Sequence, residues 1–291
     1  MPARHITIIG APFNGIGVPP EEENPAQAIR DAGLVDLLRQ RGATVVDLGD
    51  IEIPPFESRR DELTQVLNLA AWRETSLRLS SRLREVINQD TTFVILGGDC
   101  GILLGIVGAF VEHGRKIGLV MLDGHTDLRS PAASPSGEAA DIPLWVLTGR
   151  GPDELSSLYG RTPMLDDSEI AVFGYREPDM IEQTSIARYD RAQMAQLGIG
   201  RATELGLQPL LDRGLDLWLN FDVDVIDPLE MPAVHFPEPG GLSMSEATDF
   251  VKRVLDTKRT LGLSLACYHN NDDENGAAAI KLARLLSEVL A

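Results

Sequence analysis

The alternation of short apolar runs with longer amphipathic segments constrains the fold of this chain more than any other feature. Each run is rich in β-branched residues, and several end in Gly or Asp, which is typical of strands. Strands of a parallel sheet are covered on both faces and are therefore apolar along their whole length. The runs that we expect to be strands are "HITIIGAP" (5–12), "ATVVDLGD" (43–50), "TTFVILGGD" (91–99), "KIGLVMLDGH" (116–125), "EIAVFGYR" (169–176), "LDLWLNFDVD" (215–224) and "TLGLSLACY" (260–268).

Helical segments are expected between and after these runs. In residues 24–42 and 61–89, apolar positions recur three and four residues apart, and residues 276–291 have the same pattern. Strand and helix in alternation predict an α/β fold with three layers, in which a mostly parallel sheet carries helices on both faces. Proline-rich stretches look like loops rather than linkers, so residues 1–291 are expected to form a single domain.

The composition excludes several classes of function. The formal net charge is -18, which argues against nucleic acid and anionic membranes as partners, because both bind basic surfaces. No apolar stretch reaches the roughly 18 residues of a membrane span. Two cysteines do not form a disulfide framework, so we expect a reducing compartment and a cytoplasmic protein.

Acidic residues cluster where two of the expected strands end. Asp123, His125 and Asp127 follow one apolar run at alternate positions, and Asp222 and Asp224 follow another. Side chains at alternate positions of a strand share a face, so the first three would converge if the extended geometry continued past the strand end. Ligands of open parallel sheets bind beyond the carboxyl ends of the strands, which is where these residues lie.

Carboxylates that crowd together repel one another unless a cation neutralises them. The two acidic clusters therefore predict a metal site with one or two divalent ions. Oxygen ligands with an imidazole favour Mn²⁺ over Zn²⁺, with Fe and Co as further alternatives. Asp99 and Asp227, taken singly, are explained more simply as helix caps or turn residues.

Four motifs, in order, resemble those of the arginase and agmatinase family, the ureohydrolases. They are "GGDC" (97–100), "DGHTD" (123–127), "DVDVIDP" (222–228) and "PGGL" (239–242). The N-terminal residues 24–50 also resemble the first helix and second strand of that family. The resemblance implies an arginase-like fold, which agrees with the three-layer α/β fold predicted from periodicity. It also implies a small-molecule substrate and a homo-oligomer that is a trimer or a hexamer.

The resemblance also implies a catalytic role for the metals. A hydroxide between two ions would attack a guanidinium carbon, and Asp127 would accept a hydrogen bond from it. The implied ligands are Cys100, Asp123, Asp127 and Asp222 for one ion, and Asp123, His125, Asp222 and Asp224 for the other.

Three positions depart from the family pattern. Cys100 stands where the family has a histidine ligand, and a thiolate suits Mn²⁺ poorly. This site could be weak, prefer another metal or be empty, and Cys100 could simply be a small buried residue. Ala140 stands in place of a proton-shuttling histidine, and Cys267 replaces a glutamate that pairs with the guanidinium. Plain arginine or agmatine is therefore not the expected substrate.

Other side chains could take over some of these roles. His235 could supply an imidazole near the metals, or it could be an ordinary loop histidine. Arg129 and Ser136 match family positions that contact the amino-acid end of the substrate. Arg129 could hold a carboxylate in bidentate fashion, although a solvated surface arginine is an equally good interpretation.

Two functions follow from these features. The first is a metal-dependent hydrolase that cleaves a C–N bond of a guanidino, amidino or related small compound. The second is a non-catalytic or regulatory metal-binding member of the ureohydrolase family. The replacements at Ala140 and Cys267 favour the second, and the two retained acidic clusters favour the first, because buried charges are costly without a role.

Overall fold

A computed structural model describes residues 4–291 of the chain. Across these residues, eight strands form one sheet in the order β2-β1-β3-β8-β7-β4-β5-β6, and every neighbouring pair is parallel. The strands are β1 (His5–Ala11), β2 (Thr44–Asp50), β3 (Thr92–Gly97), β4 (Ile117–Leu122), β5 (Ile170–Phe173), β6 (Ala187–Tyr189), β7 (Asp216–Asp222) and β8 (Thr260–Ala266).

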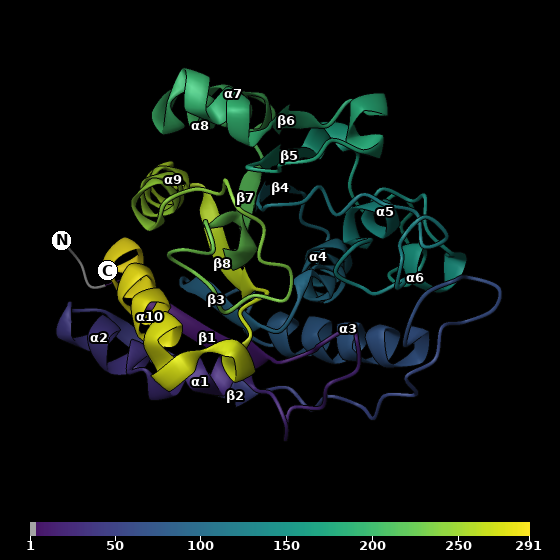
Figure 1. The fold of residues 1–291 in the computed structure, drawn as a ribbon, viewed down its shortest axis with the longest axis horizontal. Helices are drawn as coiled ribbons and strands as arrows, with labels where there is room; N and C mark the ends of the chain where they lie inside the picture. The colour runs from purple at the N-terminus through teal and green to yellow at the C-terminus, as the bar shows by residue number, and fades with distance from the viewer. Residues whose placement is uncertain (1–3) are drawn as a thin grey trace.

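Helices cover both faces of the sheet, which confirms the three-layer α/β prediction (Figure 1). Successive residues of β7 show the two faces, because Leu217 and Leu219 belong to one buried cluster and Trp218 to the other. The first cluster contains residues of α1 (Pro25–Asp31), α2 (Leu34–Gln40), α7 (Arg191–Leu197), α8 (Ile199–Asp212), α9 (Met244–Asp256) and α10 (Ala277–Leu290). The second contains residues of α3 (Leu69–Arg84), α4 (Leu103–Glu112), α5 (Pro143–Leu147) and α6 (Asp153–Ser156).

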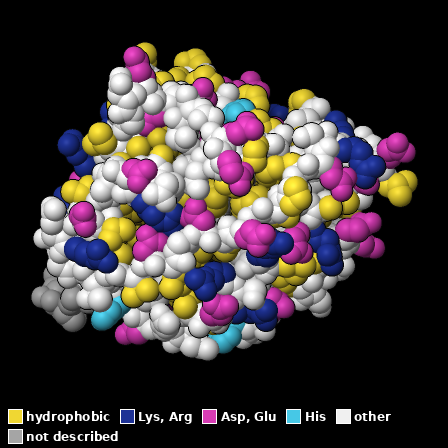
Figure 2. Space-filling view, turned by 90° about the horizontal axis from the view of Figure 1, so that it is seen from below, with side chains coloured by type: hydrophobic (Ala, Val, Ile, Leu, Met, Phe, Trp, Pro, Cys, Tyr) yellow, Lys and Arg dark blue, Asp and Glu magenta, His cyan; other side chains and the backbone are white. Residues whose placement is uncertain are grey.

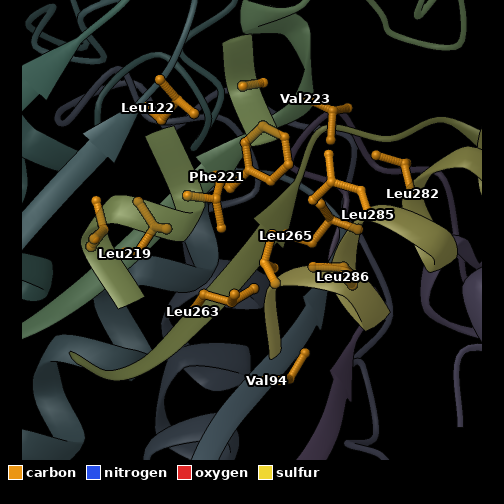
Figure 3. Packing of buried hydrophobic residues seen from close by; sticks show 14 of the residues in the cluster. Val94, Leu122, Leu219, Phe221, Val223, Leu263, Leu265, Leu282, Leu285 and Leu286 are labelled. Carbon is orange, nitrogen blue, oxygen red and sulfur yellow. The ribbon is translucent and has the colours of Figure 1, made fainter. Parts of the chain in front are cut away.

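The packing of α10 against the middle of the sheet illustrates the first cluster (Figure 3). Leu282 and Leu286 of α10 are fully buried and belong to the same cluster as Phe221 of β7 and Leu263 of β8. Burial of each such side chain contributes about 1.5–3 kcal/mol, so the central strands are held firmly. A firm sheet fixes the positions of the loops that leave its carboxyl edge.

Two expected helices differ from the structure. The segment 24–42 contains two helices instead of one, because Gly33 between α1 and α2 has a left-handed backbone with φ of 88°. In the segment 61–89, the helix starts only at Leu69, since Gln65 and Asn68 both have positive φ and end any earlier turn. The C-terminal helix α10 lies within the range expected from the sequence.

One strand was not expected from the sequence. The seven expected strands are present, and the structure adds β6, which has three residues and pairs with β5 at the edge of the sheet. A strand this short has no apolar run from which it could be predicted.

The surface carries side chains of both charges. Figure 2 shows one face of the molecule, on which acidic and basic side chains are interspersed among apolar and uncharged groups. Within residues 4–291, no helix has both the length and the apolar character needed to cross a bilayer.

Candidate metal centre

The order of the strands explains why the candidate ligands meet. β3, β8, β7 and β4 are consecutive neighbours in the sheet, and all are parallel. Asp222 is the last residue of β7. Shortly after the carboxyl ends of the other three strands come Cys100 after β3, Cys267 after β8 and Asp123 after β4. Four strands that are distant in sequence therefore bring acidic and sulfur side chains to one edge of the sheet.

The loop after β4 turns sharply. Asp127 has φ of 52°, so the extended geometry that would align Asp123, His125 and Asp127 does not persist. The loop is held instead by backbone contacts, with Leu144 N donating to the carbonyl of Asp127 at 3.0 Å. Within this loop, Asp123 lies close to both of the other two residues, but His125 and Asp127 belong to different donor groups.

The end of β7 is built by its own carboxylates. Asp222 Oδ1 accepts from Asp224 N at 2.9 Å and so caps the short 3-10 turn η4 (Val223–Val225). Asp224 Oδ1 accepts from Gly124 N at 3.0 Å, which ties this turn to the loop after β4. The same hydrogen bonds that order the two loops thus bring their carboxylates together.

The first donor group consists of Asp123, His125 and Asp224, whose candidate ligand atoms all lie within 4.8 Å of one another. His125 Nδ1 is 2.9 Å from Asp224 Oδ2 and 3.9 Å from Asp123 Oδ1. Burial alone would lower the pKa of His125, but the hydrogen bond and charge of Asp224 outweigh it and raise the pKa to about 10. Burial would likewise raise the pKa of Asp224, and the contact with His125 lowers it instead.

The second donor group consists of Cys100, Asp123 and Asp127, again within 4.8 Å. Cys100 Sγ also donates to Asp222 Oδ2 at 3.1 Å. Asp123 is fully buried and belongs to both groups, so it can bridge two ions. Burial, followed by the charge of Asp224, raises the pKa of Asp123 to about 7.

The residues present fit a divalent cation. Asp127 Oδ2 is buried and has no hydrogen-bond partner among the described residues. Burial and the charges of neighbouring carboxylates hold the pKa of Asp127 and of Asp222 well above the ordinary value. A positive ion would give the unpartnered oxygen a ligand bond and relieve the repulsion between these acids. The arrangement can therefore hold a divalent ion, and the number of ions stays a prediction.

A cavity of about 240 Å³ opens above these groups. Among the described residues, Arg129 is the one arginine or lysine in its lining, whereas acidic side chains beyond the donor groups include Glu138, Glu177, Asp179 and Glu238. Of the candidate site residues, the buried Cys100 and Asp123 lie outside this lining. Those that line it are His125, Asp127, Arg129, Ser136, Asp222, Asp224 and His235.

The candidate substrate contacts already have partners within the protein. Arg129 Nε lies 3.8 Å from Asp179 Oδ2, and Ser136 Oγ donates to Glu138 Oε1 at 2.9 Å. Ala140 and Cys267 also line the cavity, so neither position presents the imidazole or the carboxylate that the family motif would place there.

Two residues were missed by the sequence analysis: His269, which lines the cavity, and its partner Glu23, which lies outside the lining. A ring nitrogen of His269 lies 2.8 Å from His235 Nδ1, and His269 Nδ1 lies 3.1 Å from Glu23 Oε1. His269 comes just after Cys267 beyond the end of β8, so the rule that identified the other strand ends would have found it. Glu23 lies in an N-terminal loop, and no local pattern marks it.

Comparisons with known proteins agree with this fold and identify the family. The model of the Arginase family matches residues 4–291. The arginase of Staphylococcus aureus (strain COL) is 32% identical over 256 residues, which cover 83% of this chain and 82% of that protein. The arginase of Bacillus subtilis (strain 168) is 30% identical over 253 residues, covering 83% and 82%. The crystal structure of arginase from Bacillus subtilis superposes with a TM-score of 0.87 at 26% identity and covers 99% of each chain. The chain belongs to the arginase family of ureohydrolases.

Proposed function

We propose that the protein is a metal-dependent hydrolase that cleaves a C–N bond of a small guanidino or amidino compound other than plain arginine. Membership of the arginase family supports a hydrolase that acts on such bonds. The observation that carries the proposal is Asp123, a fully buried carboxylate that two donor groups share beneath a cavity.

The residues divide into metal ligands and groups that face the substrate. Asp123, His125 and Asp224 offer oxygen and imidazole donors, a combination that favours Mn²⁺. A bound divalent ion would lower the pKa of a water molecule and offset negative charge that develops on the substrate. The cavity above them is large enough for a small molecule, and its walls would hold that molecule over the ligands.

Proton transfer would fall to side chains at the cavity. Asp127, besides holding the metal, would accept a proton from the attacking water through its second carboxylate oxygen. Burial, followed by the charge of His269, lowers the pKa of His235, so His235 is neutral near pH 7. A neutral imidazole can take up a proton and pass it to the leaving amine, which Ala140 cannot do.

The charges in the cavity bear on the substrate. The excess of carboxylates over Arg129 attracts cationic groups and disfavours anions. Cys267, however, offers no carboxylate that could pair directly with a guanidinium, and such charge-assisted pairs are among the stronger anchors in a pocket. A substituted or less basic guanidine, an amidine or an amide would depend less on that missing anchor.

The test is a survey of substrates with metal counting. The purified protein is stripped with a chelator, reloaded with Mn²⁺, and assayed for urea and ammonia release from arginine, agmatine, hydroxylated and acylated guanidines, amidines and amides. We expect turnover of at least one compound, little turnover of arginine, and loss of turnover in Asp127→Asn. Asp227→Asn is the matched control, because Asp227 accepts hydrogen bonds from Leu229 N and Gly240 N in a turn and belongs to neither donor group.

The replacements at Ala140 and Cys267 favour a second candidate, a metal-binding member of the family without catalytic activity. Bound metal with no turnover across the whole panel would support this candidate and contradict the proposed hydrolase.

A further inference from the structure

Two sulfur atoms meet at one side of the candidate metal centre. Cys100 and Cys267 are the two cysteines of the sequence, and both are free thiols. They follow β3 and β8, which are neighbours in the sheet. Cys100 Sγ, Cys267 Sγ and a carboxylate oxygen of Asp222 all lie within 4.8 Å of one another. This third group contains donors of a different kind from the oxygen and imidazole group around His125.

A buried chain of hydrogen bonds aims an amide at the first sulfur. Trp218 Nε1, which can only donate, donates to Ser264 Oγ at 3.2 Å, and Ser264 Oγ donates to Asn220 Oδ1 at 2.6 Å. The amide of Asn220 is thereby oriented, and its Nδ2 donates to Cys100 Sγ at 3.1 Å. A fixed donor of this kind stabilises negative charge on sulfur, as partners behind metal ligands commonly do.

The second sulfur is held in place by the backbone. Cys267 has φ of 60°, a left-handed conformation that is unfavourable for a residue with a side chain. Its N–H donates to the carbonyl of Gly98 at 2.7 Å, which fixes this conformation against the loop after β3. Cys267 lines the cavity and is half-buried, so its sulfur is within reach of an ion that enters there.

We propose that Cys100, Asp222 and Cys267 form a thiolate and carboxylate site that selects Zn²⁺ or another soft divalent ion over Mn²⁺. Thiolates prefer soft or borderline ions, whereas carboxylates and water suit Mn²⁺. Three protein ligands with an open fourth position are the arrangement of catalytic zinc sites. The inference rests on the proposed metal centre. It divides that centre into two sites with different ligands, in which Asp123, His125 and Asp224 bind the harder ion.

Cobalt substitution tests the sulfur ligands directly. The metal-free protein is titrated with Co²⁺ and followed by absorption, because a thiolate bound to Co²⁺ produces sulfur-to-metal charge transfer in the near ultraviolet. We expect this band to appear, Zn²⁺ to remove it at one equivalent, and Mn²⁺ to leave it in place. In Cys267→Ser the band should weaken, and the affinity for Zn²⁺ should fall about tenfold or more, since even partners behind a ligand contribute 10–100-fold. Asp227→Asn, a change of one carboxylate that belongs to none of the donor groups, is the matched control and should keep both.

A second measurement needs no variant. The rate at which iodoacetamide alkylates Cys267 in the folded protein is followed by mass spectrometry in the presence of Zn²⁺, Mn²⁺ or chelator. Protection by Zn²⁺ and none by Mn²⁺ would support the site. Absence of the cobalt band, equal alkylation under all three conditions, or a Cys100–Cys267 disulfide that persists under reducing conditions would overturn it.

The outcomes separate this inference from the proposed function. Hydrolysis with Mn²⁺ alone, without any sulfur-to-metal band, would contradict the thiolate site and leave the hydrolase proposal intact. A sulfur-to-metal band in a protein that turns over no compound would support the thiolate site and contradict the hydrolase.

Discussion

Replacing Asp123 with asparagine should raise the stability of the metal-free protein and abolish its stabilisation by metal. In the folded protein, burial and the charge of Asp224 raise the pKa of Asp123 from 3.8 to about 7. The folded state therefore binds the proton more tightly than the unfolded state, so ionisation of Asp123 opposes folding as the pH rises above about 4. A shift of about three pKa units corresponds to about 4 kcal/mol at pH 7.5.

The Asp123→Asn side chain cannot ionise and does not carry this cost. Its Oδ1 can still accept from His125 N, as that of Asp123 does at 2.7 Å. At pH 7.5 the metal-free variant should thus be more stable than the metal-free wild type, by up to about 4 kcal/mol. The difference should fall below about 1 kcal/mol by pH 4, where the carboxyl is protonated in the folded state and about two fifths protonated in the unfolded state.

Metal should narrow this difference, because it stabilises the wild type selectively. An ion at 100 times its dissociation constant stabilises the folded wild type by about 2.7 kcal/mol. The variant lacks the carboxylate shared by both donor groups, so a bound ion should stabilise it much less than the wild type. The assay is urea unfolding followed by tryptophan fluorescence, with chelator or with saturating Mn²⁺. Asp227→Asn, outside the donor groups, should retain the full effect of metal. A metal-free Asp123→Asn protein less stable than the wild type at pH 7.5, or one stabilised by Mn²⁺ as strongly as the wild type, would refute this reasoning.

Three further predictions follow from the fold and the cavity. His235→Ala should lower kcat by about 10²–10⁴-fold if the imidazole transfers a proton, and added imidazole should restore part of the lost activity. Because His235 is exposed, the free energy of unfolding in urea should change little. An unchanged kcat would exclude proton transfer by His235. Phe250→Ala should lower the free energy of unfolding by about 3–5 kcal/mol. Phe250 is fully buried and packs edge to face on Phe173, with 4.8 Å between the ring centroids. A loss below about 1 kcal/mol in urea unfolding would contradict that packing. Gly98→Ala should give an insoluble or strongly destabilised protein, because a Cβ there would lie 1.8 Å from the carbonyl oxygen of Phe13. A normal yield and an unchanged urea midpoint would contradict this, because they would mean that the loops containing Gly98 and Phe13 can move apart freely.

The strands and most of the candidate ligands could be predicted from the sequence for a physical reason. Buried parallel strands need continuous apolar runs, and Asp123 and Asp222 stand out because they end such runs. Their convergence depends on the order β3-β8-β7-β4, which joins strands that are far apart in the chain. Periodicity does not specify that order, and the family resemblance implied the shared ligands without giving the order of the strands.

Other parts of the site could not be predicted because they depend on contacts between distant loops. The proximity of Cys100 and Cys267 follows from the pairing of β3 with β8 and from the left-handed backbone at Cys267. Glu23 reaches His269 across nearly the whole length of the sequence. The interruption of the first expected helix at Gly33 was visible locally, since glycine commonly ends a helix, but the apolar pattern on both sides obscured it.

The most direct test of the shared metal centre is a crystal structure of the Mn²⁺-loaded protein with anomalous diffraction measured at the manganese absorption edge. The account predicts an anomalous peak between Asp123, His125 and Asp224, with the Asp123 carboxylate in contact with the ion. A fully loaded crystal without anomalous density among these three side chains, or with the ion bound elsewhere, would contradict it.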